Sequence, residues 1–262
     1  MPTNVTEVSQ FTTNVPVPND GENANAASLL QAIQPLADRT KFLRAGLTEY
    51  AWVGRRVVYA PGDGTVRVGP CGGVVIGGKL LTLGTETDLG SAGRASNTWF
   101  YVYAYDNAGT LTMEESTTAP VASLAFKSGD ITRRYVGCFV TDGSGIPRPM
   151  RYVDGVCLYR ASAASPILAA SGSSASFADV SLAVYVPPHG RVAQLRARVV
   201  HVTGVAGLEV RTKGDTTSAI DVLVDASSTG YCPFDIETDS SQVIQWKTTG
   251  CTADVQLMGH RE

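Results

Sequence analysis

The stretch Trp99-Phe100-Tyr101-Val102-Tyr103-Ala104-Tyr105 carries the strongest structural signal in the chain. Aromatic and β-branched residues favour strands, and successive side chains of a strand point to opposite faces. One face therefore carries Trp99 and the tyrosines, and the other carries Phe100, Val102 and Ala104. Because both faces are apolar, we predict that both are covered. The second cover is another sheet, a neighbouring chain or a stacked sugar, and a covered aromatic face is favoured because buried aromatics dominate protein cores.

The same kind of sequence extends over residues 49–160, for which we predict a β-rich body domain. Short apolar runs are separated by glycine with Asn or Asp, which accept the positive φ of tight hairpin turns. Gly77-Gly78 and Asp154-Gly155 are examples. Connections this short predict antiparallel strands. The expected strands cover residues 55–60, 65–69, 73–83, 98–105, 109–113, 121–126, 133–141, 148–152 and 156–160.

A change of composition marks the end of this body. Residues 161–176, ASAASPILAASGSSAS, are mostly Ala and Ser and carry no charge, which predicts a linker. Residues 177–262 then alternate between apolar and polar positions, as where Ala193, Leu195 and Ala197 share one face. About seven such strands predict a C-terminal β-sandwich or jelly roll as a tip domain. The predicted fold class is thus mainly β, with two antiparallel β domains behind a short arm and a helix.

The N-terminal part is different in character. Residues 1–22 hold little apolar material and predict an extended arm that stays disordered or orders against a partner. Residues 23–48 contain a helix with a seam of apolar residues four and three positions apart. The seam consists of Leu29, Ile33, Leu36, Leu43 and Leu47. It is interrupted by Thr40 and bent by Pro35. The helix is either a short coiled-coil stem that oligomerises or an amphipathic helix packed on its own β domain.

Composition excludes several classes of partner. Charged residues make up 17% of the chain against roughly 25% in a typical soluble protein, and the net charge is −3. This charge offers no attraction for nucleic acid. The N-terminus lacks the basic and apolar regions of a signal peptide, and no apolar run is long enough to cross a bilayer. We therefore expect synthesis in a bacterial cytoplasm without membrane insertion.

Cysteine usage points the same way. The five cysteines are Cys71, Cys138, Cys157, Cys232 and Cys251. Their odd number and the absence of close pairs argue against a disulfide framework and against a zinc site. We expect buried, reduced thiols.

Catalytic motifs are not found in the sequence. The three histidines, His189, His201 and His260, accompany no Gly-x-Ser-x-Gly elbow, and no glycine-rich loop leads into Lys-Ser or Lys-Thr. Acidic side chains gather at Glu114-Glu115 and at 235–239. Solvated polar faces explain them better than a glycosidase pair or a cation site. We predict no enzymatic activity, no cofactor and no metal.

Two segments resemble bacteriophage proteins. Residues 15–22 (VPVPNDGE), 26–31 (AASLLQ) and 35–43 (PLADRTKFL) are similar to the N-terminal region of tail-fibre proteins of tailed phages and prophages. Residues 97–105 (NTWFYVYAY), with 133–137 (RRYVG) and 141–143 (TDG), are similar to a β module of the same proteins. Together these matches span about residues 15–160, while the C-terminal domain resembles no family known to us.

The resemblance implies a virion protein, a homotrimer anchored to other virion proteins through its N-terminus. Tail, collar or neck, and head fibres all fit, as does a phage-derived injection device. The residues implied for particle attachment are Val15, Pro16, Pro18 and Asp20. The tip would face a host-surface glycan or protein, with Tyr231 and Trp246 as candidate contacts, although Trp246 fits a core position equally well.

Two alternatives to a virion fibre or spike remain. A carbohydrate-binding module without a structural role would be a monomer that binds glycans unaided. A glycan-cleaving spike would need a cleft with two suitably spaced carboxylates, and domains near 100 residues are small for such a groove.

Overall fold

The described part of the chain is built from antiparallel β-sheets. The computed structural model describes residues 52–90, 93–121, 125–160, 167–190, 192–217, 219–224 and 228–262. Within these ranges there is no helix, and all strand pairs are antiparallel. The predicted β class is therefore confirmed. The predicted arm, helix and stem, residues 1–48, lie outside the described residues.

The strands vary from two to eleven residues in length. In the first half they are β1 (Trp52–Val53), β2 (Val57–Ala60), β3 (Arg67–Val68), β4 (Cys71–Ile76), β5 (Lys79–Leu83), β6 (Thr87–Asp88), β7 (Trp99–Asn107), β8 (Thr110–Ser116), β9 (Phe126–Lys127), β10 (Asp130–Val140), β11 (Met150–Val153) and β12 (Val156–Tyr159). In the second half they are β13 (Ile167–Gly172), β14 (Ala178–Ser181), β15 (Val192–His201), β16 (Ala206–Thr212), β17 (Ile220–Val224), β18 (Thr229–Glu237), β19 (Val243–Thr249) and β20 (Cys251–Arg261).

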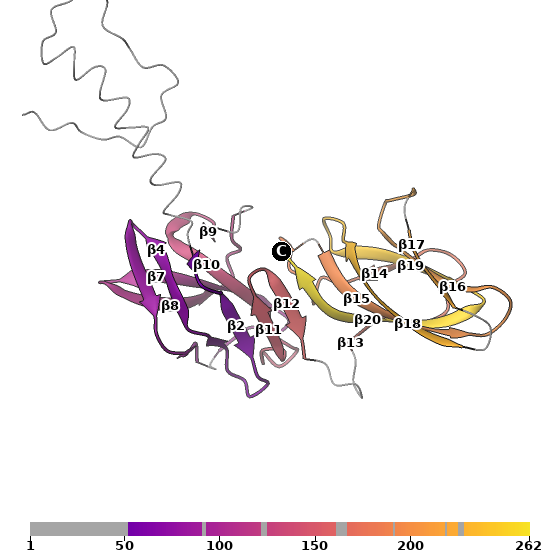
Figure 1. Cartoon of the computed structure of the whole chain (residues 1–262), viewed down its shortest axis with the longest axis horizontal. Coiled ribbons are helices and arrows are strands. Elements are labelled where there is room, and N and C mark those ends of the chain that lie inside the picture. Colours follow the sequence, from indigo (N-terminus) through magenta and orange to yellow (C-terminus); the bar gives the residue numbers. More distant parts are fainter. Residues whose placement is uncertain are drawn as a thin grey trace, which may run out of the picture.

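Residues 52–160, called the body below, form two layers. One layer is the sheet β8-β7-β10-β9. The other consists of β12-β11-β2-β3-β6, with the small sheet β1-β4-β5 beside it. Strand β10 lies against β2, β11 and β4, so the apolar faces of the two layers meet. Figure 1 shows β4, β7 and β8 together at one end of the long axis.

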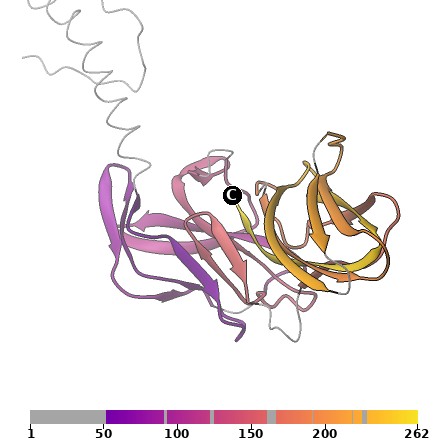
Figure 2. The ribbon, with the colours of Figure 1, turned by 45° about the vertical axis from the view of Figure 1, so that its right-hand side comes forward.

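Residues 167–262, called the C-terminal sandwich below, pack two further sheets face to face. The sheet β14-β19-β16-β17 covers the strands β18-β15-β20, with β13 on the outer side of β20 (Figure 2). Along β15 the odd positions are buried and the even positions are partly exposed. The inward face of Ala193, Leu195 and Ala197 is therefore as predicted, and the predicted β-sandwich is present.

The body and the C-terminal sandwich share one sheet through β20. This strand pairs with β15 along its whole length, and its last residues, Gly259–Arg261, pair with β12 of the body. The resulting order β18-β15-β20-β12-β11-β2-β3-β6 joins strands of both halves without a break. The buried apolar residues of both halves also form a single cluster. The two halves are thus joined by a shared sheet and a shared apolar core.

The predicted linker is wrong over its second part. Residues 167–172 are strand β13, which pairs with Ala253–Leu257 of β20, whereas residues 161–166 lie outside the described ranges. Small Ala and Ser side chains do not prevent pairing, because the ladder is made by backbone groups. The composition of this segment therefore predicts a linker, although the backbone of residues 167–172 is paired in a sheet.

The opening stretch behaves as predicted. In β7, Tyr101, Val102, Tyr103 and Ala104 are all buried, so both faces of the strand are covered. The aromatic face is covered by the protein's own side chains, since the ring of Tyr101 lies 5.2 Å from the ring of His189. The rings of Tyr101 and Tyr103 are therefore not available for sugar stacking.

Hairpin turns account for most local differences from the predicted strands. The predicted strand 73–83 is two strands joined at Gly77-Gly78, where φ is 56° and 78°. Asp154-Gly155, with φ of 48° and 89°, joins β11 to β12 in the same manner. In the C-terminal sandwich, the alternating apolar residues Val180, Leu182, Val184 and Val186 do not form one strand. Strand β14 ends at Ser181, a turn follows, and Val184 is exposed.

The junction between the two halves can be tested at Gly259. A Cβ atom there would lie 1.9 Å from the carbonyl oxygen of Cys157, so alanine cannot fit without separating β20 from β12. We expect Gly259→Ala to lower the free energy of unfolding by about 2 kcal/mol or more. In Gly84→Ala the added Cβ meets nothing within 4 Å, and the expected change is below about 0.5 kcal/mol. Urea unfolding measures both, and equal effects would contradict the shared sheet.

Candidate functional site

Most site residues predicted from the sequence cannot be placed. The seam residues Leu29, Ile33, Leu36, Leu43 and Leu47 lie outside the described residues, as do the attachment residues Val15, Pro16, Pro18 and Asp20. Both sets stay predictions. The two candidate receptor contacts, Tyr231 and Trp246, are described.

The structure separates Tyr231 from Trp246. Trp246 lies in β19, is 6% exposed and belongs to the core, so its prediction as a receptor contact is wrong. Tyr231 lies in β18 and is 60% exposed. The alternation of side chains along each strand explains the difference. Trp246 shares the inward face of β19 with Ile244, whereas Tyr231 points outward from β18.

Tyr231 belongs to a polar band on the outer face of the C-terminal sandwich. It stands directly opposite Arg198 of β15. The guanidinium of Arg196 lies 5.8 Å from the centre of the Tyr231 ring. Further across the sheet, Arg198 forms a 3.0 Å ion pair with Asp254, and Arg196 donates a 2.9 Å hydrogen bond from Nε to Gln256. The band offers one aromatic ring beside charged groups.

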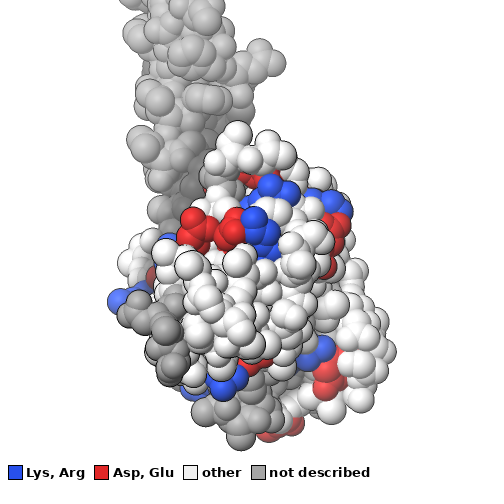
Figure 3. Space-filling view, turned by 90° about the vertical axis from the view of Figure 1, so that its right-hand side faces the viewer, with Lys and Arg blue, Asp and Glu red and all other residues white. Residues whose placement is uncertain are grey.

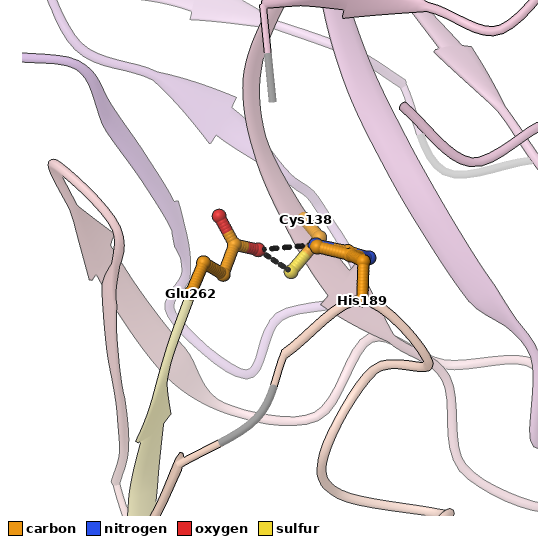
Figure 4. A group of neighbouring side chains, drawn as sticks. All are labelled: Cys138, His189 and Glu262. Atoms are coloured by element: carbon orange, nitrogen blue, oxygen red, sulfur yellow. Dashed lines mark hydrogen bonds and ion pairs between the residues drawn. The ribbon is translucent and has the colours of Figure 1, made fainter. Parts of the chain in front are cut away.

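A second group of functional side chains lies inside the molecule (Figure 4). Cys138 comes from β10, His189 from the turn before β15, and Glu262 directly follows β20. Their Sγ, imidazole nitrogen and carboxylate oxygen atoms all lie within 4.8 Å of one another. These three residues are called the Cys–His–Glu cluster below. Cysteine, histidine and glutamate are the residue types that bind transition metals and that take part in nucleophilic catalysis.

Hydrogen bonds converge on the Glu262 carboxylate. Oε1 accepts from His189 Nε2 at 2.8 Å, from the Tyr135 hydroxyl at 2.6 Å and from Cys138 Sγ at 3.2 Å. Oε2 accepts from the Tyr152 hydroxyl at 2.6 Å. The side chain of Glu262 is 0% exposed. Its charge is therefore balanced entirely by donors of the protein.

Local backbone structure aims these side chains inward. Residues 187–190 form a tight turn in which Gly190 N donates to Pro187 O at 2.9 Å, and this turn carries His189. In β20, Met258 is an extra residue that shifts the register against β15. Before it the odd-numbered positions are buried, together with Gln256, whereas after it His260 points inward. The bulge thus brings both His260 and Glu262 to the interior.

Burial controls the ionisation of the group. Burial alone would raise the pKa of Glu262, but the hydrogen bonds from His189, Tyr135 and Tyr152 lower that pKa overall, so the carboxylate is charged. Burial, reinforced by the charge of Glu262, raises the pKa of the Cys138 thiol well above its ordinary value. Burial lowers the pKa of His260 to about 4, so this imidazole is neutral near pH 7.

These properties do not suit a cysteine nucleophile. A reactive cysteine is a thiolate that substrate can reach, whereas Cys138 is 0% exposed and holds its proton. The acidic groups considered in the sequence do not form a glycosidase pair either. Glu114 contacts Lys127 and Arg133, and Glu115 is bound by Arg94.

The acidic set at the end of β18 is likewise accounted for by the protein. Asp235 pairs with Arg261 at 2.9 Å. Asp239 accepts backbone hydrogen bonds from Ser241 and Val243 of its own turn. Neither acid is directed at a shared ion position.

Sequence reasoning missed the Cys–His–Glu cluster. It considered the histidines and cysteines one by one, and the three residues are separated by 51 and 73 positions in the chain. The one available signal was His260 and Glu262 two residues apart at the end of a strand, which predicts a common face. The bulge at Met258 determines that this face is the inner one, and it leaves no mark in the alternation.

Comparisons with known proteins give no family. No family model matches the chain, and no curated protein matches it. A solved Bacillus thuringiensis Cry1Da tryptic core variant is 10% identical with a TM-score of 0.22, over 83% of this chain and 54% of that chain. The N-terminal CBM22-1-CBM22-2 tandem domain of Paenibacillus barcinonensis Xyn10C is 9% identical with a TM-score of 0.20, over 80% and 92%. The chain spans about half the length of the Cry1Da core, and neither likeness is close enough to bear on function.

The role of the buried carboxylate can be tested by removing one donor. In Tyr152→Phe, Glu262 loses the hydroxyl that binds Oε2 while the ring stays in place. We expect the free energy of unfolding to fall by about 1–3 kcal/mol, since the other partner is a buried charge. The matched control is Tyr59→Phe, whose hydroxyl binds Glu86 at the surface, with an expected change below about 0.5 kcal/mol. Equal small changes in denaturant unfolding would show that this donor does not hold Glu262.

Proposed function

We propose that this chain is a non-enzymatic structural component of a phage fibre or spike, anchored through its N-terminus and presenting the C-terminal sandwich outward. The observation that carries the proposal is the placement of β1, the first described strand. It pairs with β4 at the end of the body that lies farthest from β16, β17 and β18 (Figure 1). An N-terminal anchor would therefore attach at one end of the long axis, with the sandwich at the other.

The continuous sheet supports a mechanical role. A fibre transmits force along its length, and the order β18 to β6 joins both halves by backbone hydrogen bonds rather than by a flexible connection. The shared apolar core adds a second connection that resists bending between the halves. Both features favour a stiff spacer over two independently moving modules.

The surface supports the same proposal. On the end face that the C-terminal sandwich presents, charged side chains are sparse and the two signs are interleaved (Figure 3). Such a face provides no strong field to attract nucleic acid. Among the described residues, no helix has the length and hydropathy required to span a membrane.

Carbohydrate binding without a structural role is the second candidate, and the exposed ring of Tyr231 favours it. Sugars are bound by an aromatic ring for stacking together with planar polar groups that accept and donate hydrogen bonds. Tyr231, Arg196 and Arg198 supply this combination on one face. The same band would serve a fibre tip as a receptor contact.

Assembly tests the proposed function. We expect the full chain, 27.6 kDa per monomer, to be a trimer by light scattering, and a variant lacking residues 1–48 to lose subunits because the predicted seam is gone. Leu43→Asp should weaken the trimer in the same way, and Arg44→Asp, one position off the seam, should not. A trimer in every variant would show that the subunits associate through the β-sheets. Monomers in every variant, the full chain included, would contradict a self-assembling fibre.

Binding by the outer face is tested separately. If the polar band contacts a glycan, Tyr231→Ala should weaken binding on a glycan array at least tenfold, or about 1.4 kcal/mol, without changing stability. Leu223→Ala, at an exposed apolar residue on β17 of the opposite sheet, is the control. If Tyr231→Ala binds the glycan as tightly as the unchanged protein, the polar band is not the glycan-binding surface.

A further inference from the structure

The Cys–His–Glu cluster is unusual because its members have no role in the proposed function. We propose that it is a structural Zn²⁺ site in which Cys138, His189 and Glu262 bind the ion. His260, whose Nε2 lies 3.7 Å from Cys138 Sγ, would move closer to the other two residues to become the fourth ligand. The proposal rests on the position, chemistry and enclosure of these side chains.

The distances from Cys138 Sγ to its two neighbouring ligand atoms are close to those of a tetrahedral site. Zinc bonds of about 2.3 Å to sulfur and about 2.0–2.2 Å to nitrogen or oxygen place neighbouring ligand atoms roughly 3.3–3.5 Å apart. Cys138 Sγ lies 3.2 Å from Glu262 Oε1 and 3.7 Å from His260 Nε2. His189 Nε2 and Glu262 Oε1, at 2.8 Å, are held closer by a hydrogen bond. Replacing that proton by zinc requires the pair to separate by about half an ångström.

The set of ligand types selects the metal. A thiol, two imidazoles and one carboxylate suit zinc, whereas magnesium and calcium prefer oxygen ligands alone. Cys138 and His260 are 0% exposed and the Glu262 side chain is equally buried. Such closure is typical of structural zinc sites, while catalytic sites keep a position open to solvent.

The surroundings supply the outer contacts that a zinc site needs. Hydroxyl groups of Tyr135 and Tyr152 donate to the two oxygens of Glu262 and fix the orientation of its carboxylate. The ring of His260 packs edge-on against Trp99, with the ring centres 5.6 Å apart. A divalent ion would balance the carboxylate and the thiolate that Cys138 forms when it releases its proton to solvent during folding.

The ion would join separate parts of the fold. Cys138 belongs to the body, His189 to a turn of the C-terminal sandwich, and Glu262 directly follows the strand shared by both halves. Zinc at this point would clamp the two halves where β12 takes the place of β13 beside β20. Its binding energy would add directly to the energy of folding.

Metal content of the full chain tests the proposal. Protein purified from zinc-supplemented cells, and protein refolded with Zn²⁺, should contain about one zinc per chain by mass spectrometry. Refolding with Co²⁺ should give a thiolate-to-cobalt charge-transfer absorption. Cys138→Ser should lose that absorption and most of the zinc. Cys251→Ser removes another buried thiol, one that contacts the Gly207 carbonyl, and should retain both.

Two outcomes overturn the proposal. The first is a chain that folds but holds less than about a tenth of an equivalent of zinc after refolding with the ion, which leaves a hydrogen-bonded ion pair only. The second is a cobalt spectrum that Cys138→Ser does not change, which places the ion elsewhere. If Cys138→Ser does not fold, His189→Ala takes its place, because that side chain comes from a turn and is 11% exposed. It should lower zinc content to the same extent.

Discussion

The carboxylate of Glu262 is a charge held inside the protein, and the fold must supply what water would otherwise give it. Removing an ion from water costs several kcal/mol even after relaxation. Four donors offset that cost, from Tyr135, Cys138, Tyr152 and His189. They come from two strands of the body and from a turn of the C-terminal sandwich. A shift of β20 by one residue would turn this side chain away from all four. The register of the last strand is thus determined by a single charged group.

Register at this end determines the arrangement of the whole molecule. Strand β20 has β15 on one side throughout, but β13 gives way to β12 on the other. A strand that changes neighbours in this way belongs to both halves, so neither half can rotate without breaking backbone hydrogen bonds. The extent of the nine-stranded sheet follows from this one exchange of neighbours. A stiff body of this kind suits the fibre role that we propose, in which the two ends of the long axis have different partners.

Sequence patterns predict those parts of this fold that depend on local alternation and turn chemistry. The covered faces of β7, the inward positions of β15 and the turn at Asp154-Gly155 all follow from nearest neighbours in the chain. The Cys–His–Glu cluster does not, because it requires a bulge at Met258 to reverse the alternation of β20. Strand β13 was not predicted from the sequence for a related reason. Its Ala and Ser side chains say little about pairing, and its partner lies more than eighty residues further along.

In the fibre that we propose, stability and recognition would draw on separate groups of residues. Arg198 and Asp254 on the outer face form an ion pair that water can replace, and such pairs contribute about 0–1 kcal/mol. They can exchange partners at little cost, as a contact surface requires. The buried Glu262 cannot, because loss of any one donor leaves a charge uncompensated. The buried carboxylate of Glu262 therefore maintains the fold, whereas the exposed pair Arg198 and Asp254 lies on the surface that we propose as a contact. A changed contact on the outer face would leave the junction around Glu262 unchanged, since Arg198 and Asp254 point away from the buried side chains of β15 and β20.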